Sequence, residues 1–281
     1  MSPLPGRQVR VVPPRHGIAW LVQSMALLRA QPGRLLFIAV LLQIIMGLTQ
    51  VPLVGFLLIL SVPALSAGVL QAFRITAEGG RPVPAMLFSP LFSGSHTGRL
   101  LSLGALMFAV GILTASLFLS GNELVFDADV LARIEQGDIE ALSALDQDTL
   151  SRLVIAFVIG ISVSGTLSYM TIPLIWFHDR KLGTALADGL RALFVNWKPF
   201  LMLGLGMAAL LVPVVLLAGI LASLAGSAGF LSVILMGLVM ILLLAFQLIL
   251  FATQYCAFCD IFDLESQSIP PAGTDDSQLV A

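Results

Sequence analysis

The sequence predicts an all-α membrane protein with six transmembrane helices, arranged as three units that each join an elbow helix to a helical hairpin. Of its 281 residues, 58% are hydrophobic and 11% are charged, whereas a soluble domain usually carries about 25% charged residues. Uncharged stretches long enough to cross a bilayer recur along the chain. Lipid must therefore be the solvent for most of this apolar surface.

The first hairpin is predicted from residues 35–73, which contain no charged residue. As one helix they would measure roughly 58 Å at ~1.5 Å per residue, about twice the ~30 Å hydrocarbon core. Thr49, Gln50 and Pro52 place polar side chains and a helix breaker in the middle. We therefore expect two spans, 35–50 and 54–73, joined by a turn.

Four further spans are expected at residues 100–120, 153–177, 200–224 and 230–254. Pro63, Pro173 and Pro213 interrupt three of the six spans. A proline in a membrane helix usually produces a kink whose freed carbonyl is satisfied by a neighbour, although broken helices also line some transport sites. We favour the kink.

The remaining segments are elbows, tails and one hydrophilic loop. Residues 16–30 and 182–197 have helical apolar spacing and are expected to lie on the membrane surface. Residues 1–15, with four Pro and three Arg, and residues 263–281 are expected to be disordered tails of a single membrane domain, 16–262. Residues 121–150 carry eight carboxylates and one basic residue, Arg133.

Charge predicts the orientation of the chain. With six spans, both termini share one side of the membrane with residues 74–99 and 178–198. That side holds all of the 14 basic residues except Arg133 and Arg152. The positive-inside rule makes this side cytoplasmic and places the acidic 121–150 segment on the opposite, periplasmic side.

The hairpins form a possible threefold repeat over residues 16–73, 84–177 and 182–254. Internal duplication and the plain similarity of any consecutive helical hairpins both explain it.

Short motifs give the chain a resemblance to a known family. The segments Pro14–Trp20, Val51–Gly55 and Tyr255–Phe262 resemble those of an uncharacterised family of proteobacterial six-span inner-membrane proteins. More loosely, the layout is similar to the membrane domain attached to glycerophosphodiester phosphodiesterases. Cys259 stands where that family has an arginine, so no role of the arginine carries over. The resemblance implies topology and a bacterial inner-membrane location, with both termini cytoplasmic.

The absence of ionisable residues from the six predicted spans excludes several functions. Residues 199–259 contain no charge at all. Proton relays, ion-coupled pumps and intramembrane proteases need such groups. The chain also lacks nucleotide-binding, serine-hydrolase and nucleic-acid motifs. We therefore expect no catalytic residue, metal, cofactor or nucleic-acid partner, and no enzyme activity.

Polar residues inside the spans are the candidate binding residues. The fourth span carries the set Ser162, Ser164, Thr166, Ser168 and Tyr169. Helix packing is favoured over the wall of a path for a neutral substrate or lipid. The amides of Gln43 and Gln247 are expected to pair with each other or with a backbone carbonyl, and substrate binding is the less favoured alternative.

Candidate interfacial residues flank the spans. We expect contact with lipid headgroups from Trp20, Trp176, His178, Arg180, Lys181, Trp197 and Lys198. Cys256 and Cys259 form one isolated CxxC, for which packing is the default interpretation.

The sequence favours a non-enzymatic scaffold or accessory subunit that binds lipid or other membrane proteins. Its expected partners are the bilayer, lipid headgroups or another membrane protein. The alternative is a passive or lipid-type transporter that uses the polar face of the fourth span. A headgroup-modifying enzyme that relies on His178 and Asp179 is a third hypothesis.

Overall fold

The computed structural model describes residues 9–119, 147–225 and 230–262, and every regular element within them is helical. Six helical segments are long and apolar enough to cross a membrane. The chain is therefore an all-α, multi-pass membrane protein, as predicted. The six segments are Pro32–Gln50, Leu53–Ala77, Ser95–Leu117, Leu150–His178, Trp197–Leu224 and Leu231–Phe262.

The described residues form eight α-helices and three short 3-10 helices. The α-helices are α1 (His16–Ala30), α2 (Pro32–Gly47), α3 (Pro52–Ala77), α4 (Ser95–Leu119), α6 (Gln147–His178), α7 (Leu182–Val195), α8 (Trp197–Ala225) and α9 (Leu231–Phe262). The 3-10 helices are η1 (Leu48–Gln50), η2 (Pro84–Leu87) and η3 (Ser89–Leu91). The acidic segment predicted over 121–150 lies outside the described residues, apart from 147–150 at the start of α6.

Several helices extend beyond the predicted spans. Helix α4 begins at Ser95 rather than at 100, and α9 continues to Phe262 rather than ending at 254. Arg99 and Asp260 therefore lie on helices. Their charges are paired with other parts of the chain, as described below, so the helix need not end where the apolar run ends.

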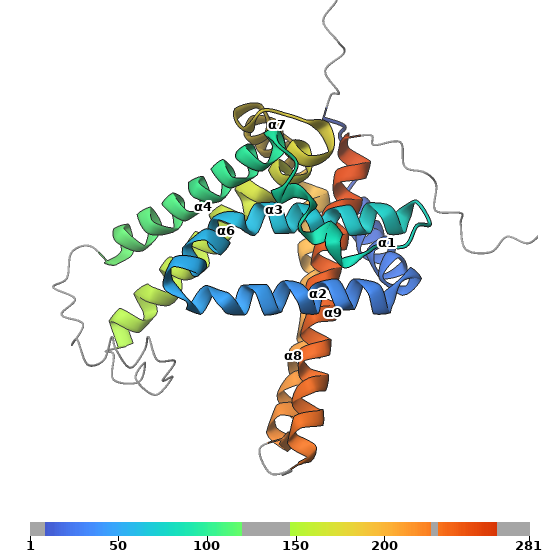
Figure 1. Cartoon of the computed structure of the whole chain (residues 1–281), viewed down its shortest axis with the longest axis vertical. Coiled ribbons are helices and arrows are strands. Elements are labelled where there is room, and N and C mark those ends of the chain that lie inside the picture. The colour runs from blue at the N-terminus through green and yellow to red at the C-terminus, as the bar shows by residue number, and fades with distance from the viewer. Residues whose placement is uncertain (1–8, 120–146, 226–229, 263–281) are drawn as a thin grey trace, which may run out of the picture.

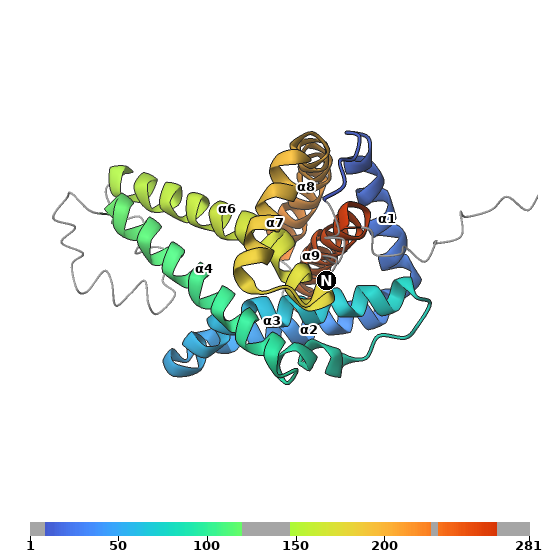
Figure 2. The ribbon, with the colours of Figure 1, turned by 90° about the horizontal axis from the view of Figure 1, so that it is seen from above.

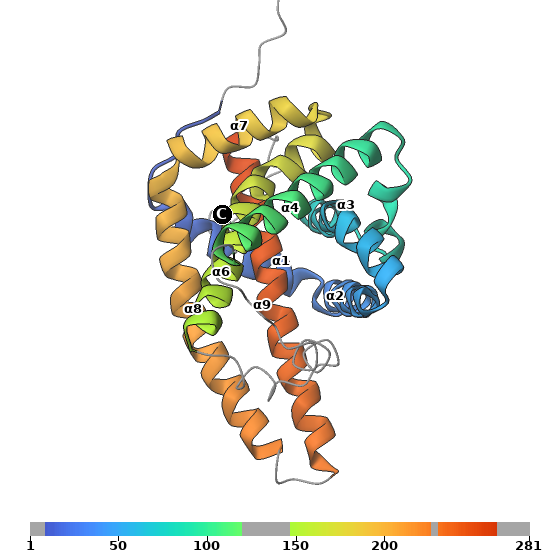
Figure 3. The ribbon, with the colours of Figure 1, turned by 90° about the vertical axis from the view of Figure 1, so that its left-hand side faces the viewer.

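Three hairpins, α2–α3, α4–α6 and α8–α9, meet in a common region, which we call the junction (Figures 1 and 2). The first two hairpins stay in contact beyond it through α3 and α4, where the Phe56 and Phe108 rings lie 5.5 Å apart. The second helices of the three hairpins, α3, α6 and α9, contact one another there. Away from the junction, the α8–α9 hairpin extends in a different direction from α2–α3 (Figure 3). Because α8–α9 diverges from the other two hairpins, 11% of the apolar window of α9 is buried, compared with 44% of the window of α3.

Aromatic side chains fill the junction. Phe73 of α3 and Phe258 of α9 are both 0% exposed. The Phe177 ring of α6 lies 5.8 Å from the Phe258 ring, and the Arg74 guanidinium lies 5.6 Å from the Phe177 ring centroid. Buried aromatic surface of this kind supplies much of the packing energy where helices meet.

Helix α1 packs against α8 and α9 rather than lying alone on the membrane surface. Trp20 is 1% exposed, and its ring lies 5.3 Å from that of Phe200. Protein rather than lipid headgroups therefore covers Trp20, and the expected depth of α1 at the membrane surface stays a prediction. The approach is close because Gly17 has no side chain: a Cβ there would overlap the Pro199 carbonyl oxygen and lie 2.7 Å from the Leu203 nitrogen.

Residues 9–15 differ from the disordered arm that composition predicts. The Arg10 N–H donates to the Ile261 carbonyl over 3.0 Å. The Val12 N–H donates to Oδ1 of Asn196 over 2.9 Å, and Nδ2 of Asn196 donates to the Arg10 carbonyl over 3.0 Å. The Asn196 amide thus replaces the hydrogen bonds that an extended segment would otherwise make with water. These contacts place the start and end of the membrane domain side by side.

The proline in α6 produces a polar contact between helices. Pro173 has no N–H, so the carbonyl of Tyr169, four residues earlier, loses its usual helical donor. Nε2 of Gln254, on α9, donates to that carbonyl over 2.6 Å. A neighbouring side chain thus satisfies the freed carbonyl, as we expected for the prolines of the spans.

We expect Gln254→Leu to lower the free energy of unfolding by about 1–2 kcal/mol, because the Tyr169 carbonyl loses its donor in an apolar setting. The same change on a Pro173→Ala background should cost less, since the backbone N–H restored at position 173 can bond that carbonyl. A double-mutant cycle on the protein in micelles measures this coupling. Equal costs on both backgrounds would contradict the pairing.

Candidate functional site

Polar side chains gather at the junction in two networks, each centred on a carboxylate. The first surrounds Asp260, near the end of α9. Oδ2 of Asp260 lies 2.6 Å from Nδ1 of His16 and accepts a 2.9 Å hydrogen bond from Nε1 of Trp20. Nη1 of Arg10 lies 4.0 Å from Oδ1. The Asp260 network thus fastens the first elbow helix to the last span.

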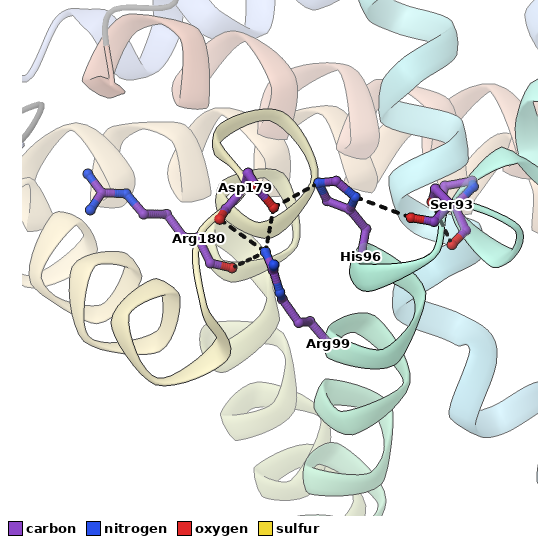
Figure 4. A network of polar contacts seen from close by, with 6 residues as sticks. Ser93, His96, Arg99, Asp179 and Arg180 are labelled. Atoms are coloured by element: carbon purple, nitrogen blue, oxygen red, sulfur yellow. Dashed lines mark hydrogen bonds and ion pairs between the residues drawn. The ribbon is translucent and has the colours of Figure 1, made fainter.

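The second network surrounds Asp179, which follows the end of α6 (Figure 4). Nη1 of Arg99, on α4, donates to Oδ1 of Asp179 over 2.6 Å and to the carbonyls of Asp179 and Arg180 over 3.0 and 3.2 Å. Nε2 of His96 lies 3.1 Å from the same Oδ1. One guanidinium therefore serves both the carboxylate and the backbone at the end of a helix.

The backbone geometry explains this arrangement. Asp179 has φ 51°, in the left-handed region, and the Arg180 N–H donates back to the Leu174 carbonyl over 3.2 Å. A left-handed residue just after the last turn is a common way for helices to end, and aspartate tolerates the conformation better than most residues. The positive charge of Arg99 also complements the negative end of the α6 dipole. The Asp179 network is thus a helix cap supplied by another helix.

Arg99 also sets the titration of this carboxylate. The hydrogen bond from Arg99, together with its charge and that of His96, holds the pKa of Asp179 below its usual range. The folded protein therefore binds this proton less readily than the unfolded chain does. The stabilisation is present above the usual aspartate pKa of about 4 and is lost as the pH falls through the lowered value.

We expect Asp179→Asn to flatten the acid limb of the stability curve. Asparagine tolerates the same backbone conformation but cannot ionise. Wild type should lose stability more steeply than the variant below about pH 4, and the two should converge at the acid extreme. Thermal unfolding in micelles at stepped pH measures both curves. Parallel curves would show that Asp179 does not contribute.

The structure separates two residues that are adjacent in the sequence. The His178 ring lies 5.1 Å from that of Phe258 and 6.1 Å from that of Phe262. Asp179 instead contacts His96 and Arg99. The two residues that the third hypothesis names thus contact different neighbours, and the hypothesis itself stays a prediction.

Of the other candidate interfacial residues, two have polar partners within the chain and three are exposed. Trp176 is half-buried, and its Nε1 donates to Oε1 of Gln71 over 3.1 Å. Arg180 lies 3.9 Å from Asp188. Lys181, Trp197 and Lys198 are exposed, and the Lys198 ammonium lies 5.8 Å from the centroid of the Trp197 ring. Contact of these residues with headgroups stays a prediction.

The polar residues of the fourth span do not converge on one site. Ser162 and Thr166 are exposed, and each donates to its own helix, to the Val158 and Ser162 carbonyls, over 2.7 Å. Ser164 is half-buried and Ser168 is buried, and Ser168 donates to the Gly165 carbonyl over 3.2 Å. These three hydroxyl bonds thus stay within α6.

Tyr169 faces inward from α6. Its ring lies 5.7 Å from that of Phe200, nearly edge to face. Its hydroxyl is buried near Thr253 and Cys256, and it makes no hydrogen bond of good geometry with a described residue.

The two amides within the spans do meet. Nε2 of Gln43, on α2, donates to Oε1 of Gln247, on α9, over 3.4 Å. This confirms the expected pairing of the two side chains, which bridges the first and third hairpins.

The described residues offer few candidate metal ligands or reactive thiols. Among the described residues, no group of three or more His, Cys, Asp or Glu side chains is placed to hold a metal ion. Cys256 is buried and Cys259 is half-buried, and both are free thiols.

Three residues with partners across the junction were not predicted from the sequence: Arg99, Asn196 and Asp260. Each is a polar residue close to the end of an apolar run, where charge usually indicates a solvated boundary. A partner elsewhere in the chain cannot be read from that position.

Comparison of the chain with protein-family models, curated proteins and solved structures matched none of them.

Proposed function

We propose that this membrane protein is a non-enzymatic scaffold or accessory subunit of the bacterial inner membrane that binds lipid or other membrane proteins through its spread hairpins. The observation that carries the proposal is the divergence of the α8–α9 hairpin from the other two (Figures 1 and 3). The apolar windows of α8 and α9 are each 11% buried within the chain. Such surfaces need lipid or protein neighbours.

The junction supports a structural role. The Asp260 and Asp179 networks hold helices together, and their carboxylates are engaged by groups from other elements.

Charge supports the orientation: Arg74, Arg99 and Arg180 lie at the junction, and the N-terminal segment meets α9 there. We therefore place the junction and both termini on the cytoplasmic side.

Native mass spectrometry of the protein in nanodiscs made with native lipid tests the proposal. We expect a lipid class, retained in fixed stoichiometry after activation and enriched over the bulk composition, or a stoichiometric partner protein. The proposal would be overturned if every bound lipid and protein were lost at low activation energy and the lipids that co-purify had the same composition as the bulk membrane.

The same measurement separates the transporter alternative. Ser164→Leu alters the polar face of the fourth span, and Ser102→Leu alters an exposed hydroxyl on α4 as a matched control. A scaffold should keep its lipid in both variants. A ligand lost from Ser164→Leu alone would favour transport along α6.

A further inference from the structure

The Gln43–Gln247 pair lies midway along the spans and is incompletely bonded. Gln247 stands at the centre of the 32-residue helix α9, and Gln43 is exposed. A primary amide has two N–H donors and a carbonyl acceptor. The hydrogen bond from Gln43 to Gln247 leaves the Gln247 N–H groups and the Gln43 carbonyl without a partner among the described residues. Free amide groups at this depth are costly in hydrocarbon.

Gln247, which is half-buried, lies within a stripe of exposed apolar residues along α9, which we call the α9 stripe. Successive members are spaced three and four residues apart, the spacing of the seam between two packed helices. The apolar members are between 43% and 69% exposed. The stripe consists of Val233, Met236, Met240, Leu243, Gln247 and Leu250.

We propose that a second copy of this chain packs on the α9 stripe, so that two α9 helices run in parallel and their amide pairs join. Every copy inserts with the same topology, so Gln247 lies at the same depth in each. The Gln247 N–H groups of each copy can then donate to the carbonyl of the partner's Gln43. Two such bonds across a twofold axis satisfy the amides that one copy leaves free.

A lipid fits this site less well than a second copy does. Lipid carbonyls lie at the edges of the hydrocarbon core, about 15 Å from its middle. The acyl chains at the depth of Gln247 carry neither donors nor acceptors. A polar residue within a seam of apolar residues also fixes the register of two packed helices, which suits identical partners.

Cysteine cross-linking tests the interface in membranes. On a Cys256→Ser, Cys259→Ser background, Leu243→Cys places one thiol on the stripe. Ile241→Cys is the matched control, because Ile241 is 44% exposed but lies about 200° away around the helix. We expect a membrane-permeable oxidant to give disulfide-linked dimers at least tenfold faster from Leu243→Cys. Equal rates, or linkage to a different protein, would overturn the proposal.

The amides are tested by energy transfer between labelled copies in liposomes, with the native cysteines retained. Gln247→Leu should weaken self-association by about three- to tenfold, the range of interhelical polar contacts in membranes. The melting temperature of the Gln247→Leu variant distinguishes weaker self-association from misfolding. Wild type that stays monomeric over the whole range of protein-to-lipid ratios would refute the dimer. The proposal is independent of the scaffold function, because lipid retention and dimer formation can each fail alone.

Discussion

Gly104→Ala is expected to lower the free energy of unfolding by about 2 kcal/mol, because α4 and α3 touch there through their backbones. A Cβ at Gly104 would overlap the carbonyl oxygen of Leu60 and lie 2.8 Å from its carbonyl carbon. Both atoms belong to a helix backbone, so the strain cannot be relieved by turning a side chain. Chemical unfolding in micelles measures the loss.

Gly111 supplies the matched control on the same helix. It lies two turns from Gly104, on the same face, yet no described atom is within 4 Å of a Cβ built there. We expect Gly111→Ala to be neutral or up to about 1 kcal/mol more stable, the usual gain from replacing glycine in a helix. Equal destabilisation at both positions would contradict the close approach at Gly104.

Asp260→Ala should cost about 3 kcal/mol, the other large effect we expect. The change removes the acceptor for the indole N–H of Trp20, a side chain that is 1% exposed. A buried donor left without a partner costs about 1–3 kcal/mol, and the contact with His16 is lost as well.

Glu78→Ala is the control for removing a carboxylate near the end of a span. Oε1 of Glu78 accepts a hydrogen bond from Arg74 over 2.9 Å, but both side chains are more than a third exposed. An exposed pair within one helix contributes about 0.5 kcal/mol or less. The two variants should therefore differ clearly in thermal unfolding, and similar losses would show that Asp260 does not anchor α1.

Hydropathy and helix breakers predict the fold because they act locally. The uncharged run over residues 35–73 is too long for one span, and Pro52 begins α3 where the turn was expected. The pairing of Gln43 with Gln247 was also predictable, since an amide in hydrocarbon needs a polar partner and the spans offer few.

Local sequence patterns could not predict what covers the elbow helix α1, or which residues pair in the Asp260 and Asp179 networks. An amphipathic helix has the same sequence pattern whether lipid or protein covers its apolar face, so Trp20 was placed in the interface although it packs on Phe200. His178 and Asp179 are adjacent in the sequence, but the turn that ends α6 directs them to different neighbours. Those partners come from α4 and α9, which are distant in the sequence.

The packing of α1 on α8 and α9 has a consequence for the order in which the chain assembles. A ribosome releases α1 before α8 and α9, the helices that cover Trp20 and supply the carboxylate that binds its indole. The α2–α3 and α4–α6 hairpins can each pair while synthesis continues. Helix α1, in contrast, has to wait for α8 and α9, so truncation of the chain before Asp260 would remove the acceptor for the Trp20 indole and loosen the other end of the described chain as well.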